Sequence, residues 1–168
     1  MSDSIMSGSI NEFKQGKSPL IMPQDESTPF CPWSDDFLLG IDRLDKQHDA
    51  LFSTLNKLHD ILMSHGSPVA IDKTLSCLID QTRVHFQTEE TFMQQHDYPD
   101  YEGHKTLHDI LLRQIEGVLE TQHELESYHL QQSWAEKLDL ADFLREWLLS
   151  HIVDADKKLG DFLKKHGG

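Results

Sequence analysis

The chain has 168 residues, 38% of them hydrophobic, which is enough for one domain with a substantial core. Its 29 acidic and 15 basic residues give a formal net charge of −14 at pH 7, which argues against nucleic acid or an anionic membrane surface as a partner. No stretch approaches the ~18 apolar residues of a membrane span, and the two cysteines, Cys31 and Cys77, are too few for a disulfide framework.

The N-terminal stretch is rich in Ser, Gly, Pro and polar side chains and shows no hydrophobic periodicity. Residues 1–30 are therefore predicted to form a flexible leader ahead of one domain at residues 31–168. No basic segment followed by an apolar run opens the chain, so we expect no signal peptide and a cytoplasmic location. From Cys31 to Asp42 the chain is apolar, and we expect Trp33, Phe37 and Leu38 to lie in an ordered loop across the end of a helical body.

Four segments then repeat apolar residues at steps of three and four, the spacing of α-helices with one buried face. They span about residues 44–64, 70–96, 100–126 and 133–165. Because no segment alternates in the manner of a strand, we predict an all-α fold, an up-down-up-down antiparallel four-helix bundle with an N-terminal extension. Cys77 falls in the second helical pattern, where a buried thiol would be ordinary, and Phe143 is predicted to face inward from the fourth.

Each apolar stripe also carries residues that bind metals. The candidates are His48 on the first helix, His85 and Glu89 on the second, His104 and His108 on the third, and His151 on the fourth. A buried carboxylate without a partner costs several kcal/mol, and coordination is the readiest way to satisfy many imidazoles in an apolar interior. These are more ligands than one ordinary ion needs, which favours a site for two. The other histidines fall at loops, helix ends or polar faces and are predicted to be solvated; they are His59, His65, His96, His123, His129 and His166.

The fourth helix is also expected to supply a carboxylate. Asp154 lies three residues after His151 and on nearly the same helical face, whereas Asp156 lies five residues after it, about 140° around a helix with ~3.6 residues per turn. Spacing alone therefore does not select Asp156. Imidazole and carboxylate ligands without thiolate suit iron, although zinc or manganese would also accept them.

Taken in order, His48, an HxxxE motif (His85, Glu89), an HxxxH motif (His104, His108) and an HxxxxD motif ending at Asp156 resemble the full ligand pattern of the hemerythrin family. The resemblance covers about residues 31–165 and includes the flanking runs GIDRLDKQHDALF, EETFM and WLLSHI. The chain is most similar to the bacterial stand-alone type, bacteriohemerythrin.

The resemblance implies two iron ions per chain joined by a bridging oxo or hydroxo group. One iron would be bound by His104, His108 and His151, the other by His48 and His85, with Glu89 and Asp156 bridging them. It selects Asp156 over Asp154, and the awkward spacing predicts either a local distortion of the helix or a strained side-chain reach near residues 153–156. The second iron would keep an open position for dioxygen, next to a dry pocket for which the candidate lining residues are Leu51, Phe86, Trp147, Leu148 and Ile152.

The favoured function is therefore reversible dioxygen binding for carriage, storage or sensing, without catalysis. A di-iron enzyme that turns over peroxide, nitric oxide or oxygen is the alternative, and an oxygen-sensing interaction module is a third. Ferritin-like di-iron oxidases carry a Glu-x-x-His motif that this site lacks. The expected partners are dioxygen and an electron donor or signalling protein, and the chain is expected to be a monomer.

Overall fold

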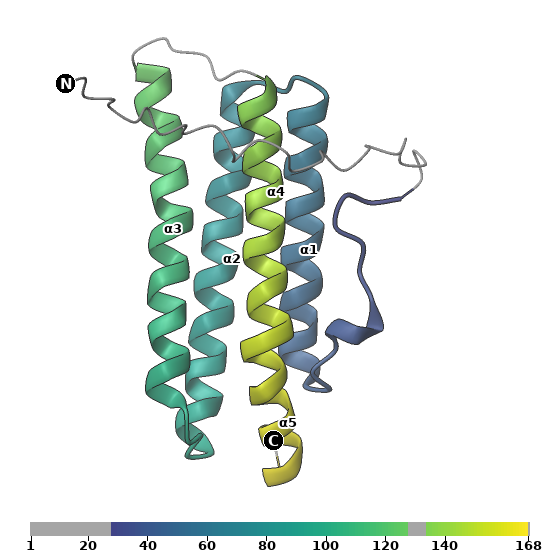
Figure 1. The fold of residues 1–168 in the computed structure, drawn as a ribbon, viewed down its shortest axis with the longest axis vertical. Helices are drawn as coiled ribbons and strands as arrows, with labels where there is room; N and C mark the ends of the chain where they lie inside the picture. The colour runs from purple at the N-terminus through teal and green to yellow at the C-terminus, as the bar shows by residue number, and fades with distance from the viewer. Residues whose placement is uncertain (1–27, 128–133, 168) are drawn as a thin grey trace, which may run out of the picture.

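The computed structural model describes residues 28–127 and 134–167, and this part of the chain contains helices and no strand. The elements in chain order are the 3₁₀-helix η1 (Asp35–Phe37), α1 (Asp42–Met63), α2 (Pro68–Gln95), α3 (Tyr101–Ser127), α4 (Trp134–His151), the π-helix η2 (Ile152–Asp156) and α5 (Lys157–His166). Figure 1 shows four antiparallel rods side by side, the last made of α4, η2 and α5 in succession. The predicted four-helix bundle is confirmed, and the expected helix ends differ from the observed ones by about two residues at most. None of the described helices is long and apolar enough to cross a membrane.

Short polar signals set the helix boundaries that bring α2 opposite its neighbours. Ser67 caps α2, since its side chain accepts a hydrogen bond from the backbone of the first turn, and Pro68 occupies the first helical position, where no amide donor is needed. After α2, Asp97 adopts a left-handed φ of 51°, and the Tyr98 amide donates to the Met93 carbonyl at 2.9 Å. This tight reversal sends α3 back along α2.

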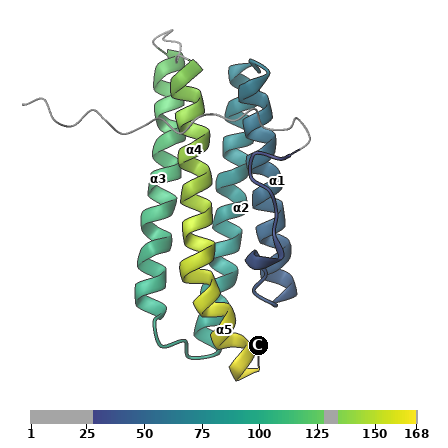
Figure 2. The ribbon, with the colours of Figure 1, turned by 45° about the vertical axis from the view of Figure 1, so that its right-hand side comes forward.

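The segment before α1 runs along the flank of that helix (Figures 1 and 2), not across the end of the bundle as expected. Asn56 on α1 holds it in place, because the Asn56 side chain accepts from the Cys31 amide at 2.7 Å and donates to the Cys31 carbonyl at 2.9 Å. Trp33 meets Phe52 edge to face, with ring centroids 5.1 Å apart. The expected loop is therefore ordered; its first part covers the side of α1, and it reaches α5 at Leu38, whose carbonyl accepts from Lys157 Nζ at 2.8 Å. Most of the predicted leader, residues 1–27, lies outside the described residues, as does the connection at 128–133.

Two expected side-chain placements are wrong. Phe143, predicted to face inward, is about two-fifths exposed, and the Cys77 thiol is exposed. On a helix that turns ~100° per residue, Cys77 lies about 200° from Leu75, so it points away from the buried stripe. Phe143 is offset by about 100° from the fully buried Leu144 and falls outside the stripe for the same reason.

The bundle core consists of two apolar layers with a polar layer between them. The larger layer includes Leu55, Leu78 and Leu144, and the smaller one, at the end where α5 lies, comprises Leu39, Ile41, Leu44, Met93, Leu159 and Leu163. The predicted metal ligands fall between these layers along each rod: on α1, for example, His48 follows Leu44 of the smaller layer and precedes Leu51 of the larger one. Water is thus excluded from both sides of the ligands.

Candidate metal centre

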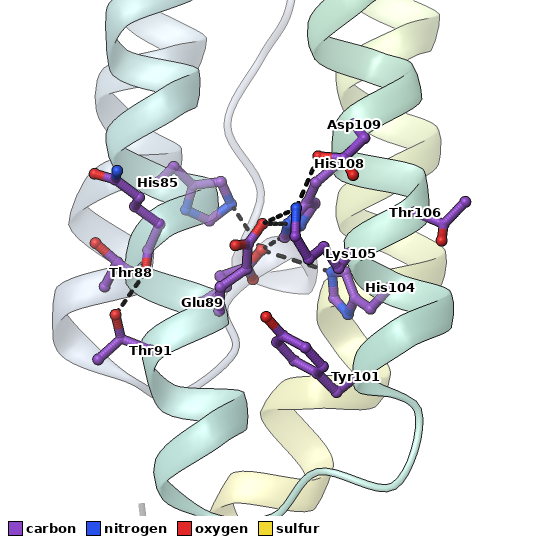
Figure 3. A network of polar contacts seen from close by, with 12 residues as sticks. His85, Thr88, Glu89, Thr91, Tyr101, His104, Lys105, Thr106, His108 and Asp109 are labelled. Atoms are coloured by element: carbon purple, nitrogen blue, oxygen red, sulfur yellow. Dashed lines mark hydrogen bonds and ion pairs between the residues drawn. The ribbon is translucent and has the colours of Figure 1, made fainter.

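All four rods contribute to the polar layer, and all seven predicted ligands are buried. Their exposed fractions range from 0% for His48 to 7% for His151. Figure 3 shows how two of the helices meet, with Glu89 between His85 on its own helix and His104 and His108 on the facing one. The i,i+4 pairs His85/Glu89 and His104/His108 project from single helix faces, as their spacing predicts.

The seventh residue, Asp156, is brought to the centre by the π-helix η2. In η2 the Lys157 amide donates to the Ile152 carbonyl, five residues back, where an α-helix would use the carbonyl four residues back. This wider turn places Asp156 beside His151, with Oδ1 and Nε2 2.9 Å apart. Asp154 is exposed. The predicted distortion is confirmed, and it removes the geometric objection to Asp156.

The seven side chains form two overlapping sets of converging ligand atoms. One set contains Glu89, His104, His108, His151 and Asp156, and the other contains His48, His85, Glu89 and Asp156; within each set the ligand atoms lie within 4.8 Å of one another. The two carboxylates are common to both sets. This is the division into five and four ligands, with two shared bridges, that the resemblance implies.

All five imidazoles direct Nε2 toward the two carboxylates. His108 Nε2 lies 3.1 Å from Glu89 Oε2, His104 Nε2 lies 3.3 Å from Asp156 Oδ1, and His48 Nε2 lies 3.2 Å from Asp156 Oδ2. Even so, four of the converging atoms have no hydrogen-bond partner, namely Glu89 Oε1, His104 Nε2, His151 Nε2 and Asp156 Oδ1. Buried polar atoms are rarely left in this state, so the geometry fits cations placed among them.

Burial and the charges of neighbouring ligands together set the protonation of the centre in the absence of metal. Burial raises the pKa of Glu89 to about 8, reinforced by the charge of Asp156. It lowers the pKa of His85 to about 4 and that of His108 to about 2, so both imidazoles are neutral and can coordinate. For Asp156 burial acts upward, but the neighbouring imidazoles, His151 first, outweigh it and hold the pKa well below its ordinary value.

Two residues that the sequence pattern did not single out contact the outer nitrogens of the ligands. Glu90 Oε1 lies 3.1 Å from His108 Nδ1, and Gln47 Oε1 lies 3.3 Å from His85 Nδ1. Both are sequence neighbours of ligands, Glu90 of Glu89 and Gln47 of His48. Their position next to a ligand was the only indication in the sequence that Glu90 and Gln47 belong to the site. It did not show which histidine each residue would contact on the facing helix.

A small cavity adjoins the centre. Its volume, counted as space open to the centre of a water-sized molecule, is about 10 Å³, roughly what one such molecule needs. All five predicted pocket residues line it, with His85, His151 and Asp156 on the side of the ligands; the other lining residues are Thr82 and Leu111. Apart from Thr82, whose hydroxyl donates to the Leu78 carbonyl, the cavity is apolar except where it meets the centre.

One of the remaining histidines differs from its prediction. His59 is not solvated but stacks on Phe30, with ring centroids 4.1 Å apart and planes within 5°. His123 pairs with Asp72 at the surface, and the His166 ring donates from Nδ1 to the Phe162 carbonyl at 2.8 Å. His65 is exposed, His96 is half-buried, and His129 lies outside the described residues. Within the described chain, the histidines outside the polar layer do not join the metal-binding sets.

Comparisons with known proteins agree with this geometry. The family model for the Hemerythrin HHE cation binding domain matches residues 39–163. A bacteriohemerythrin from Methylococcus capsulatus is 37% identical over 119 residues, 71% of this chain and 85% of that protein, and a myohemerythrin from Theromyzon tessulatum is 29% identical over 126 residues, 75% of this chain and 88% of that protein. A crystal structure of wild-type hemerythrin superposes with a TM-score of 0.69 at 32% identity, covering 80% of this chain and 98% of the other. From its ligand pattern, its fold and these matches, the chain belongs to the hemerythrin family.

Proposed function

We propose that this protein binds dioxygen reversibly at a centre of two iron ions. The observation that carries the proposal is the division of the buried ligands into sets of five and four that share Glu89 and Asp156. An ion held by the set of five ligands would have little room for another ligand, whereas an ion held by the set of four would keep a position for a small molecule.

The residues of the centre would hold the metals in distinct ways. Neutral imidazoles donate Nε2 lone pairs without adding charge, while the two shared carboxylates draw the cations together and offset part of their repulsion. Two ferrous ions, when bound, supply the reversible electron transfer by which dioxygen is held. The protein itself must keep that position selective for a small apolar gas.

The cavity supports this selectivity. Leu51, Phe86, Trp147, Leu148 and Ile152 present apolar surface toward the ligands, and the space among them is about that of one water-sized molecule. Phe86 also stacks on His108, with ring centroids 3.8 Å apart and planes within 6°, which fixes the imidazole and seals that wall. Excluding water would slow loss of electrons from the irons and so keep oxygen binding reversible.

The test begins with iron analysis of the purified chain, for which we expect two irons per polypeptide. Anaerobically reduced protein is then exposed to oxygen, followed by removal of the gas under argon. A visible absorption band that appears with oxygen and disappears with argon over repeated cycles supports the proposal. Steady consumption of oxygen, peroxide or nitric oxide by the reduced protein would instead identify an enzyme, and a chain that binds one iron or none would exclude the proposed centre.

A further inference from the structure

The two predicted iron positions differ in what lies behind one histidine of each. His108, in the set of five ligands, is backed by the carboxylate of Glu90, whereas His85, in the set of four, is backed by the amide of Gln47. Outer partners of this kind orient a ligating imidazole and raise its basicity. A charged partner and a neutral one do so to different degrees.

On the side of Gln47, the hydrogen bonds fix every orientation. Thr88 donates its one hydroxyl proton to the Val84 carbonyl at 2.8 Å, so it can only accept from the Gln47 amide nitrogen, at 3.0 Å. The Gln47 carbonyl oxygen must then face His85 and accept from Nδ1. His85 Nε2 is left with its lone pair toward the centre, backed by a neutral acceptor.

On the side of Glu90, the acceptor is a carboxylate. It can only accept, so His108 Nδ1 donates to it and Nε2 keeps its lone pair. Burial raises the pKa of Glu90 above its ordinary value, and the ammonium of Lys105, whose Nζ lies 3.9 Å from Glu90 Oε1, acts against that rise. In Figure 3, Lys105, His108 and Asp109 lie together on α3, on the side of Glu89 that faces away from His85. His108 thus has an anion behind it that His85 lacks.

We propose that Glu90 and Gln47 are positioning residues that make the two irons unequal, with the Glu90-backed iron the more readily oxidised of the pair. This inference deepens the proposed di-iron function and rests on it. An imidazole that donates to a carboxylate is a stronger electron donor than one that donates to an amide, so it stabilises ferric over ferrous iron. The low dielectric around these fully buried rings preserves that difference.

The experiment uses the full-length iron-loaded protein in an anaerobic spectroelectrochemical cell, where one electron passes between each iron and a dissolved mediator. Glu90→Gln removes the charge but keeps an acceptor, and should raise the lower of the two midpoint potentials by about 59 mV, a tenfold change in the one-electron equilibrium. Gln47→Glu adds a charge behind His85 and should lower the upper potential by a similar amount. Glu116→Gln is the matched control, because Glu116 pairs with Arg83 on the bundle surface.

Opposite shifts in the two variants, with Glu116→Gln close to wild type, would support the inference. Equal potentials in Glu90→Gln and Glu116→Gln, or shifts of the same sign in Glu90→Gln and Gln47→Glu, would overturn it and leave the di-iron function intact. A wild-type chain without two irons would instead overturn the proposed function. Where Glu90→Gln does not retain iron, the sign of the shift in Gln47→Glu decides.

Discussion

Replacing Leu148 by alanine tests whether the cavity keeps the centre dry. Leu148 is 5% exposed and lines the cavity beside His151. Removing three carbons from the interior costs ~2.4 kcal/mol in transfer free energy at ~0.8 kcal/mol per methylene, and the enlarged cavity brings the total to about 3–4 kcal/mol. For a chain of this size that lowers Tm by roughly 10 °C. Leu144→Ala is the matched control, since Leu144 is fully buried one turn earlier on α4 and does not line the cavity.

The assay follows the absorption of the oxygenated protein as it decays to the ferric form at a temperature well below both Tm values. The space vacated in Leu148→Ala can admit a water molecule next to the ligands. We therefore expect autoxidation at least about tenfold faster than in wild type, which corresponds to an activation free energy lower by only ~1.4 kcal/mol. Leu144→Ala should lose similar stability without the faster decay. If the two variants decayed equally fast, the effect would come from general loosening of the core, and the pocket role of Leu148 would be refuted.

Two further substitutions have controls within the chain. Asp156→Asn should bring the iron content well below two per chain because it weakens a shared bridge, whereas Asp154→Asn, on the exposed face of η2, should retain both irons by elemental analysis. Gly160→Ala should destabilise the protein by about 1–3 kcal/mol in thermal unfolding, despite the better helix propensity of alanine, because its Cβ would lie 2.9 Å from Leu39 Cβ. Gly117→Ala, with open space around the added carbon, should gain up to ~1 kcal/mol, and a gain in both variants would contradict the steric account.

The sequence predicted the helical scaffold and six of the candidate ligands because both follow from local periodicity. His85 and Glu89, four residues apart on an apolar stripe, must share a buried face if the stripe forms a helix. Asp156 could not be reached in this way. Regular helix geometry favoured Asp154, and only the family resemblance pointed to Asp156. The π-helix at Ile152–Asp156 supplies the physical reason, since one wider turn changes which residue faces the centre.

The interactions that periodicity missed are those between elements. Glu90 and Gln47 sit on polar positions that look like ordinary solvated helix flanks, and their partners depend on how two helices are rotated against each other. The position of the segment before α1 also depends on a contact between elements that are distant in sequence. Asn56 meets the backbone of Cys31 across 25 residues of sequence, and an isolated asparagine in a helical pattern gives no sign of such a contact.

The metal-free protein should lose stability as the pH rises from about 6.5 to 9, whereas the iron-loaded protein should change less. The raised pKa values of Glu89, from 4.5 to about 8, and His104, from 6.5 to about 9, mean that the folded state holds protons that the unfolded chain releases. The stability from Glu89 is complete below pH 4.5 and is lost as the pH rises through about 8; that from His104 is complete below pH 6.5 and is lost through about 9.

His85 and His108, whose pKa values are lowered, act the other way and reduce stability only as the pH falls below 6.5, so they do not offset the loss at high pH. Bound iron takes the place of the protons on Glu89 and His104. The folded, iron-loaded protein therefore has no such protons to lose as the pH rises, and its free energy of unfolding changes less. Thermal unfolding of chelator-stripped and iron-loaded protein at pH 6.5 and 9 measures the difference, and Glu89→Gln in the stripped protein should flatten its decline. If the Tm of the stripped and loaded forms fell equally between pH 6.5 and 9, the raised pKa values of Glu89 and His104 would not be the cause of the loss of stability.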